Sequence, residues 1–272
     1  MEHRWRHILL LLIAAGSLAG LMSLPPIVQH PAYHVFADQR AFFDVPRFLD
    51  IVTNLPFLIV GIAGLRRCLR GRTTGALRSW VVFFAGVAMI GLGSAYYHLD
   101  PTDQTLAWDR MPMTVGFMGA LVAVLAERVS KRIEEHALLP MVLAGMASVL
   151  WWVVFGDLRP YCWIQLLPMM LIPAVLLLYA RRRSEDRFII LAVVFYAFAK
   201  GTEYFDQEVY RMTCRLLSGH SLKHLVAAAG CAILFAMLKR RKRAGPGRGP
   251  ATGEQEAGNW QNGLLQARKD AP

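Results

Sequence analysis

The sequence is short of charge and of cysteine. Only 18% of its 272 residues are charged, whereas 55% are hydrophobic, and the mean hydropathy is +0.36. Its four cysteines, at positions 68, 162, 214 and 231, include no CxxC pair. This spacing indicates neither a disulfide scaffold nor a thiolate zinc site. Any metal ion would therefore be held by histidine and carboxylate side chains.

Acidic residues are also scarce, with 19 Asp and Glu against 30 Lys and Arg, which gives a net charge of +11. Such an excess can indicate a nucleic-acid-binding protein. Here, however, the basic residues form short clusters between apolar runs and do not form one face, and the connections between these clusters lean acidic. This is the positive-inside pattern of membrane proteins. The predicted partner is therefore the bilayer, and no nucleic acid is expected.

Several apolar runs approach the roughly 20 residues that are needed to cross a bilayer. With their flanking charges they predict eight spans, at about 8–25, 47–65, 79–98, 108–127, 138–155, 162–180, 187–205 and 219–238. The basic connections at 66–78, 128–137 and 181–187 are placed in the cytoplasm with the C-terminus. The predicted fold class is all-α, a polytopic membrane helix bundle of seven core transmembrane helices plus one extra N-terminal helix.

Three segments are expected along the chain. Residues 1–28 form an N-terminal transmembrane helix or signal anchor, although the basic start MEHRWRH before an apolar run also fits a cleaved signal peptide. Residues 29–240 form the seven-helix core. Residues 241–272 are rich in Gly, Pro and polar residues and predict a disordered cytoplasmic tail.

Three of the eight histidines lie where the predicted spans begin or end. His98 closes one helix, and His220 and His224 open the last one in the motif SGHSLKH. The i, i+4 spacing of that pair puts both side chains on one helix face, as helices often present two ligands to zinc. On the predicted topology all three histidines lie at outer helix ends. An ionisable residue at such a position is a candidate for function.

Two further polar residues reach the same depth. Ser94 precedes His98 by one helical turn, and Asp109 opens the next helix in WDRMPMT. Three neutral imidazoles leave the fourth tetrahedral position of Zn²⁺ to water, an arrangement typical of catalytic sites. Asp109 is predicted to orient that water or take its proton. Ser94 is predicted to hydrogen-bond a ligand, the water or an oxyanion.

Simpler explanations exist for each of these residues. A lone histidine at a helix end is more often an interfacial hydrogen-bonding group than a ligand. Asp109 also fits an anion near a helix N-terminus, and Ser94 fits a small residue that lets helices approach. Haem is the alternative metal centre, because His98 could pair with either histidine of the last helix, although no CxxCH motif is present.

Three charged residues near the same helix ends give weaker signals. Lys223 is predicted to point to another helix face than the two histidines and to snorkel to the interface or bind a lipid phosphate. Lys200 and Glu203, at i and i+3, predict a local ion pair. Glu203 alternatively supports a metal ligand.

Asp50 and Asn54 share a face of the first core helix and could reach the site, and Asn54 could satisfy backbone groups freed by Pro56. Cys162 and Cys214 both fall in outer regions. They could form a disulfide in an oxidising compartment, but two free thiols are the favoured interpretation.

Together the motifs SAYYH, WDRMPM, SGHSLKH and FLDIVTNLPFLIVG resemble those of the alkaline ceramidases and their bacterial relatives. That family belongs to a superfamily of seven-helix membrane hydrolases that includes the adiponectin-type receptors. The resemblance implies a zinc ion held by His98, His220 and His224, with Asp109 and Ser94 completing the catalytic site. It further implies hydrolysis of the amide bond of ceramide to a sphingoid base and a fatty acid.

The site toward the non-cytoplasmic side, predicted from the basic loops, agrees with the orientation that resemblance to the ceramidase branch implies, whereas the receptor-type relatives are inverted. The predicted location is the bacterial cell (inner) membrane, as a multi-pass protein. The chain departs from the family in one respect that concerns metals. Eukaryotic members carry a carboxylate-rich calcium site before the first core helix, whereas this segment offers only Asp38 and Asp44 and has Arg47 in place of a terminal carboxylate. Calcium dependence is therefore not expected.

Two other functions remain compatible with the same motifs. One is a zinc-containing, lipid-sensing receptor-type protein with little turnover, and the other is a lipid ester hydrolase that uses the same site. The acyl-chain preference, the head-group preference and the oligomeric state are not encoded in any pattern of the sequence.

Overall fold

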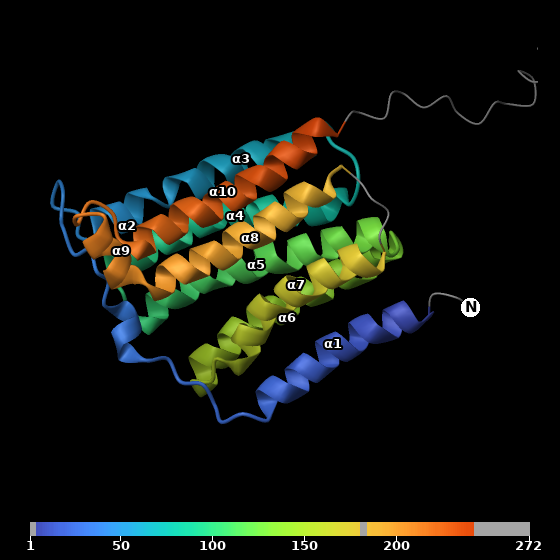
Figure 1. Cartoon of the computed structure of the whole chain (residues 1–272), viewed down its shortest axis with the longest axis horizontal. Helices are drawn as coiled ribbons and strands as arrows, with labels where there is room; N and C mark the ends of the chain where they lie inside the picture. The colour runs from blue at the N-terminus through green and yellow to red at the C-terminus, as the bar shows by residue number, and fades with distance from the viewer. Residues whose placement is uncertain (1–3, 180–183, 242–272) are drawn as a thin grey trace, which may run out of the picture. The chain divides into compact units, whose positions relative to one another are not determined.

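The computed structural model describes residues 4–179 and 184–241, which form helices and connections without a β-strand. The predicted disordered tail lies, from residue 242 on, outside the described residues. The helices are α1 (Arg4–Met22), the short 3-10 helix η1 (Pro31–His34), α2 (Phe48–Val52), α3 (Leu55–Leu69), α4 (Leu77–Leu99), α5 (Asp103–Arg128), α6 (Arg132–Phe155), α7 (Arg159–Leu178), α8 (Asp186–Tyr204), α9 (Asp206–Met212) and α10 (Gly219–Arg240) (Figure 1). The all-α prediction is confirmed.

Membrane-spanning length and apolar composition are found in seven helical units of the described chain, which are α1, α2 with α3, α4, α5, α6, α7 and α10. An eighth span results when α8 and α9 count as one, although the chain bends by 85° between them. With that pair counted as one span, the described chain has one N-terminal candidate span and seven core candidate spans, the number that the polytopic bundle prediction gave.

The observed helices extend beyond the predicted spans where polar residues continue the helix. The helix predicted from 108 begins at Asp103, because Thr102 and Thr105 form a capping box at its start. The connection between the predicted spans 187–205 and 219–238 contains α9, a helix that the sequence pattern did not predict. A hydrophobic run predicts only the part of a helix that faces lipid or the core, so the polar turns at helix ends are not predicted.

The first core span, predicted as one helix, is broken between α2 and α3. The interruption falls just before Pro56, which has no backbone N–H to donate. Asn54 Nδ2 donates to the carbonyl oxygen of Asp50 at 2.7 Å, so Asn54 satisfies a backbone group at this break, although not the carbonyl of Val52 that Pro56 leaves without its donor. The break places the last residues of α2 beside the start of α10, where two of the histidines lie.

The core helices pack around α5, which contacts α4, α6 and α7, while α10 packs against α3 and α8. The helix α1 lies at the edge of the bundle against α7 (Figure 1). Two glycines permit close crossings near the helix ends. A Cβ on Gly93 would lie 2.2 Å from the carbonyl oxygen of Trp108, and one on Gly219 would lie 2.2 Å from that of Thr202. These crossings bring α4 against α5 and α10 against α8.

The end of α4 and the starts of α5 and α10 lie at one end of the bundle, the end that carries α2 and α9 in Figure 1. We call it the α9 end. Cys162 and Cys214 are free thiols in the structure, so the favoured interpretation agrees with the structure and the alternative disulfide is not formed.

Candidate metal centre

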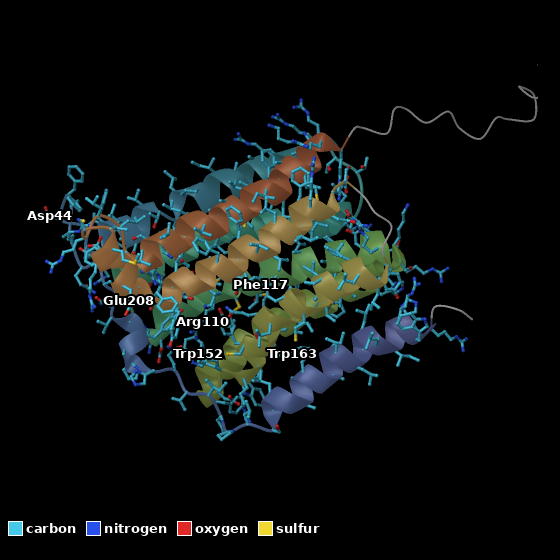
Figure 2. The ribbon with its side chains drawn as sticks, viewed as in Figure 1. Asp44, Arg110, Phe117, Trp152, Trp163 and Glu208 are labelled. Carbon is cyan, nitrogen blue, oxygen red and sulfur yellow. The ribbon has the colours of Figure 1, made fainter. Side chains whose placement is uncertain are left out.

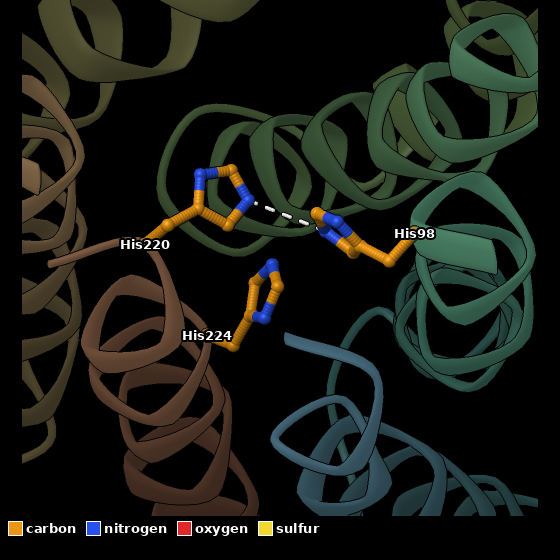
Figure 3. A group of neighbouring side chains, drawn as sticks. All are labelled: His98, His220 and His224. Atoms are coloured by element: carbon orange, nitrogen blue, oxygen red, sulfur yellow. Dashed lines mark hydrogen bonds between the residues drawn. The ribbon is translucent and has the colours of Figure 1, made fainter. Parts of the chain in front are cut away.

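His98, His220 and His224 come together at the α9 end of the bundle (Figure 3). One ring nitrogen from each lies within 4.8 Å of the other two. The Nε2 atoms of His98 and His220 are 3.2 Å apart, and the three ring centroids are 4.9 to 5.1 Å from one another. Their exposed fractions are 0%, 5% and 3%, so all three imidazoles are buried. The structure thus gathers the three histidines that the sequence singled out.

The start of α10 is fixed by two capping groups, and this fixes the two histidines of its first turns. The Ser218 hydroxyl accepts a hydrogen bond from the Ser221 backbone N–H at 2.9 Å. Asp206 Oδ1 accepts from the His220 backbone N–H at 2.7 Å, and its Oδ2 accepts from the Ala37 N–H at 2.9 Å. Asp206 therefore joins the N-terminal segment to the helix that carries His220 and His224.

Thr53 sets the tautomer of His224. Its hydroxyl lies 3.0 Å from His224 Nδ1 and 2.7 Å from the carbonyl oxygen of Leu49. A threonine hydroxyl has one proton, and the carbonyl can only accept, so that proton goes to Leu49 and His224 Nδ1–H donates to Thr53. The other nitrogen, Nε2, then carries a lone pair. It is buried and has no hydrogen-bond partner among the described residues.

This donor set fits a zinc ion. Zinc binds histidine nitrogen at 2.0–2.1 Å, so two tetrahedral ligand atoms lie about 3.3 Å apart. The 3.2 Å between Nε2 of His98 and of His220 agrees with that spacing. Burying a ring nitrogen without a partner is costly, and a metal ion would satisfy the lone pair of His224. The alternative of a haem is not favoured, because three rings around one point suit an ion and leave no place for a planar macrocycle.

Asp109 and Ser94 line one cavity together with His224. Both are buried, and a Cβ on Gly93, the residue before Ser94, would lie 3.5 Å from the Cα of Asp109. Their proximity follows from the close crossing of α4 and α5 at Gly93. The predicted catalytic pair thus opens to the same space as one of the three imidazoles.

The cavity has a volume of about 310 Å³ and is mostly apolar. Along α5 it extends from Asp109 to Val124, which is about 22 Å of helix. Its walls come from α4, α5, α7, α8 and α10, and its apolar part is lined by side chains that include Trp80, Phe83, Phe117, Ile172, Val193 and Leu234. A long, narrow apolar space that ends at polar side chains suits a lipid chain attached to a polar group.

Lys223 does not snorkel to the interface, so that prediction is wrong. Its Nζ donates to Glu203 Oε1 at 2.9 Å and lies 3.0 Å from His220 Nε2. Residues at i and i+3 share a helix face, and the long lysine side chain reaches the neighbouring ring. The predicted ion pair between Lys200 and Glu203 is present. Tyr33 donates to the same carboxylate at 3.2 Å, and burial raises the pKa of its hydroxyl.

Arg110 forms a second buried cation at the polar end of the cavity. Its guanidinium carbon lies 4.3 Å from the ring centroid of Trp152 and 4.8 Å from that of Tyr161 (Figure 2). Its Nη2 donates to Gln29 Oε1 at 2.6 Å. Arg110 thereby ties α5 to α6, α7 and the segment that follows α1. No local pattern of the sequence indicates this role, because Trp152 and Tyr161 lie on separate helices, far from Arg110 in the chain.

The segment before α2 covers the histidines. Phe36 packs its ring 4.7 Å from that of His98 and 4.6 Å from that of His220, and only 3% of it is exposed. Arg47 donates through Nε to the carbonyl oxygen of His98 and through Nη2 to that of Leu99, both at 2.8 Å. These carbonyls end α4, so Arg47 holds the helix end that presents His98.

Asp38 and Asp44, the two carboxylates of the segment where eukaryotic relatives bind calcium, have different surroundings. Asp38 is buried and accepts from Arg40, while Asp44 is exposed (Figure 2). Asp50 is buried beside the metal-ligand candidates, where its Oδ1 accepts from Ser221 Oγ at 2.5 Å and from Ser218 Oγ at 3.3 Å. Asp50 therefore supports the first turn of α10.

Comparison with known proteins agrees with this architecture. A family model described as Ceramidase matches residues 45–250, which is more than half of the chain. No match was found among curated proteins.

Proposed function

The chain belongs to the ceramidase family, and from this premise we propose that it is a membrane-embedded, zinc-dependent amidohydrolase. Its family implies a hydrolase that acts on an amide and a substrate that is a lipid. The proposed reaction is cleavage of the amide bond of ceramide or a similar lipid amide to a sphingoid base and a fatty acid.

One observation carries the proposal. The three imidazoles cluster, and one of them, His224, lines the polar end of an apolar cavity together with Asp109 and Ser94; this cavity follows α5 for about 22 Å. His98, His220 and His224 would hold the zinc ion. When bound, zinc polarises a carbonyl and makes water a nucleophile near neutral pH.

The residues of the chain would divide the remaining work. Asp109 would accept a proton from the attacking water, whose oxygen forms a bond to the amide carbon. The carbon–nitrogen bond then breaks, and Asp109 would return the proton to the departing amine. Ser94, beside Asp109, would hold the carboxylate or the water in position by donating its hydroxyl proton. The apolar walls would exclude other water from the reacting groups.

The shape of the cavity supports an orientation for the substrate. Its polar end is lined by Tyr33, Arg110 and Lys223, and its deep part by Trp80 and Leu234. The acyl chain would lie along α5 in the deep part, so that the amide sits near Asp109. The head group would lie among the polar side chains, and the walls from α7 and α8 would flank the route from the bilayer.

We further propose that the site faces the non-cytoplasmic side of a bacterial inner membrane. This orientation is supported by the basic connections 66–78, between α3 and α4, and 128–137, between α5 and α6. Both connections join these helices at the end of the bundle opposite the α9 end. Positive loops stay in the cytoplasm. A membrane-impermeant thiol reagent applied to spheroplasts should therefore label Cys214, an exposed residue of the α9 end.

The test is release of fatty acid from a panel of labelled ceramides by the purified protein. We expect release by the unaltered chain and none by an Asp109→Ala variant that still contains zinc. Release that the substitution leaves unchanged would contradict the proposed role of Asp109. A zinc-containing protein that cleaves no amide would favour the lipid-sensing receptor, and preference for matched esters would favour the ester hydrolase.

A further inference from the structure

Lys223 lies at the polar end of the cavity, but the proposed reaction gives it no role. It lines the cavity with Asp109 and Ser94, and its side chain is 16% exposed. Its Nζ lies 3.0 Å from Nε2 of His220. A fixed positive charge thus stands beside a candidate ligand of a divalent cation, which is electrostatically unfavourable unless an anion lies between them.

Glu203 holds Lys223 in this place. Its Oε1 accepts from Lys223 Nζ at 2.9 Å and from Tyr33 Oη at 3.2 Å, and its other oxygen accepts from Lys200. The Glu203 carboxylate therefore accepts from three donors, and its single negative charge is divided between Lys223 and Lys200. Held in this way, the ammonium is pre-positioned, and little side-chain freedom remains to be lost when it binds a ligand.

The polar end of the cavity has an excess of positive charge. Its lining includes three cationic side chains, Arg110, Lys200 and Lys223, and two acidic ones, Asp109 and Glu203. The zinc ion of the proposed function would add to this excess. A site with this balance, surrounded by apolar walls, favours a ligand that carries a negative charge on oxygen.

Binding of a metal ion would also change what Lys223 can contact. In the structure one Lys223 N–H points to His220 Nε2, the atom that would face the ion. Once that lone pair is used by a metal, the ammonium loses this acceptor and keeps Glu203. Its freed N–H then needs an oxygen from the cavity.

We propose that Lys223, positioned by Glu203, is an oxyanion-binding residue that holds the acyl oxygen of the substrate and then the carboxylate of the released fatty acid. This inference rests on the proposed amide hydrolysis. Attack of water forms a carbon–oxygen bond and moves an electron pair onto the carbonyl oxygen, to which Lys223 donates a hydrogen bond. When the carbon–nitrogen bond breaks, both protons of the attacking water end on the departing nitrogen, so that the amine leaves as an ammonium and the acyl group becomes a carboxylate. Lys223 keeps its own proton throughout.

The experiment compares binding of two probes, the fluorescent fatty acid cis-parinaric acid and the alcohol of the same chain, to purified protein with and without zinc. The variants are Lys223→Met and Lys223→Arg. Lys200→Met is the matched control, because it removes a charge and a partner of Glu203 from an exposed position without contact to His220. A Lys223→Met/Glu203→Gln double variant guards against unfolding caused by an unpaired buried carboxylate.

We expect Lys223→Met to weaken the fatty acid about tenfold to a hundredfold, as loss of a charge-assisted hydrogen bond does, with the alcohol unchanged. Lys223→Arg should retain most of the affinity, Lys200→Met should weaken it several times less than Lys223→Met does because its charge is half-exposed and screened, and zinc content should stay the same. In turnover, Lys223→Met should lower kcat more than it raises KM. Equal fatty-acid affinity in Lys223→Met, or an equal loss in Lys200→Met, would overturn the proposal.

The two proposals fail separately. A protein that cleaves no amide but binds the fatty acid through Lys223 would remove the hydrolase and keep the carboxylate site. A protein that releases fatty acid while its binding is indifferent to Lys223 would keep the hydrolase and remove the role of Lys223.

Discussion

Thr53 Oγ1 lies 3.0 Å from His224 Nδ1, so a residue at the break between α2 and α3 orients an imidazole of α10. The hydroxyl donates its hydrogen bond to the carbonyl oxygen of Leu49 and accepts one from His224 Nδ1–H, which leaves His224 Nε2 with a lone pair directed at the other two rings (Figure 3). The contact is made at the break itself, which falls just before Pro56.

Thr53→Val should therefore weaken zinc binding. Valine has the same shape but cannot accept from His224 Nδ1–H, and loss of such supporting contacts typically costs 10- to 100-fold in metal affinity. Competition with a chromogenic chelator measures this affinity. Thr53→Ser, which keeps the hydroxyl, should bind zinc nearly as the unaltered chain does. Equal affinities in all three proteins would contradict the role of Thr53.

Asp109→Asn should abolish turnover and leave zinc bound. The amide keeps the size of the carboxylate but cannot take a proton from water, and removal of a general base typically costs 10²- to 10⁴-fold in rate. Single-turnover assays with a labelled ceramide, together with metal analysis of the same sample, measure both quantities. Ser94→Ala should lower kcat by less. If Asp109→Asn loses its zinc, Asp109 is a ligand and not a base.

Ala120→Leu should shorten the acyl chain that the protein accepts. Ala120 lines the cavity on α5, eleven residues or about 16 Å beyond Asp109, so a larger side chain would fill its deep part. Rates for a series of N-acyl chain lengths should fall for long chains and stay for short ones. Ala147→Leu on the exposed face of α6 is the control. A uniform fall over all lengths would mean damage to the fold.

Asp157→Asn should loosen the segment between α1 and α7 and remove a step of acid sensitivity. Hydrogen bonds from Arg159 lower the pKa of Asp157 to about 2. A carboxyl whose folded pKa is depressed stabilises the fold above its unfolded pKa of about 3.9, and this is lost as the pH falls toward 2. Thermal unfolding should separate the two proteins at pH 7 and bring them together near pH 2. A constant difference would contradict the assignment.

Removal of calcium should leave the activity unchanged when free zinc is buffered at a constant level. Arg47 already donates to the carbonyl oxygens of His98 and Leu99, so a cationic side chain ties this helix end to the preceding segment. Arg47→Gln should instead loosen the end of α4 and reduce both thermal stability and zinc affinity. Activity that returns only with added calcium would show that the prediction from the sequence is wrong.

The positions of the three histidines were predictable because they depend on two regular properties. A spacing of four residues keeps His220 and His224 on one helix face, and alternation of basic loops brings the end of α4 to the level where α10 begins. The same reasoning placed Asp109 and Ser94 at that level. Depth and helix face are therefore accessible from the sequence.

The supporting contacts were not predictable, because they depend on how helices cross and on irregular segments. Lys223 was placed on another face, yet the close approach of α8 and α10 at Gly219 directs it to Glu203 and His220. Phe36 belongs to a segment without periodicity, and its place over two imidazoles follows only from the tertiary structure. The residues next to Lys223 and Phe36 in the sequence do not indicate which distant residues these side chains contact.

The most direct test of the central claim is the metal content of the detergent-purified protein and of three single variants, His98→Ala, His220→Ala and His224→Ala, measured by inductively coupled plasma mass spectrometry. Convergence of the three imidazoles on one cation predicts about one zinc per chain, and near-complete loss in each folded variant. Zinc that remains bound when His98 is replaced, or a folded and active protein that contains none, would contradict it.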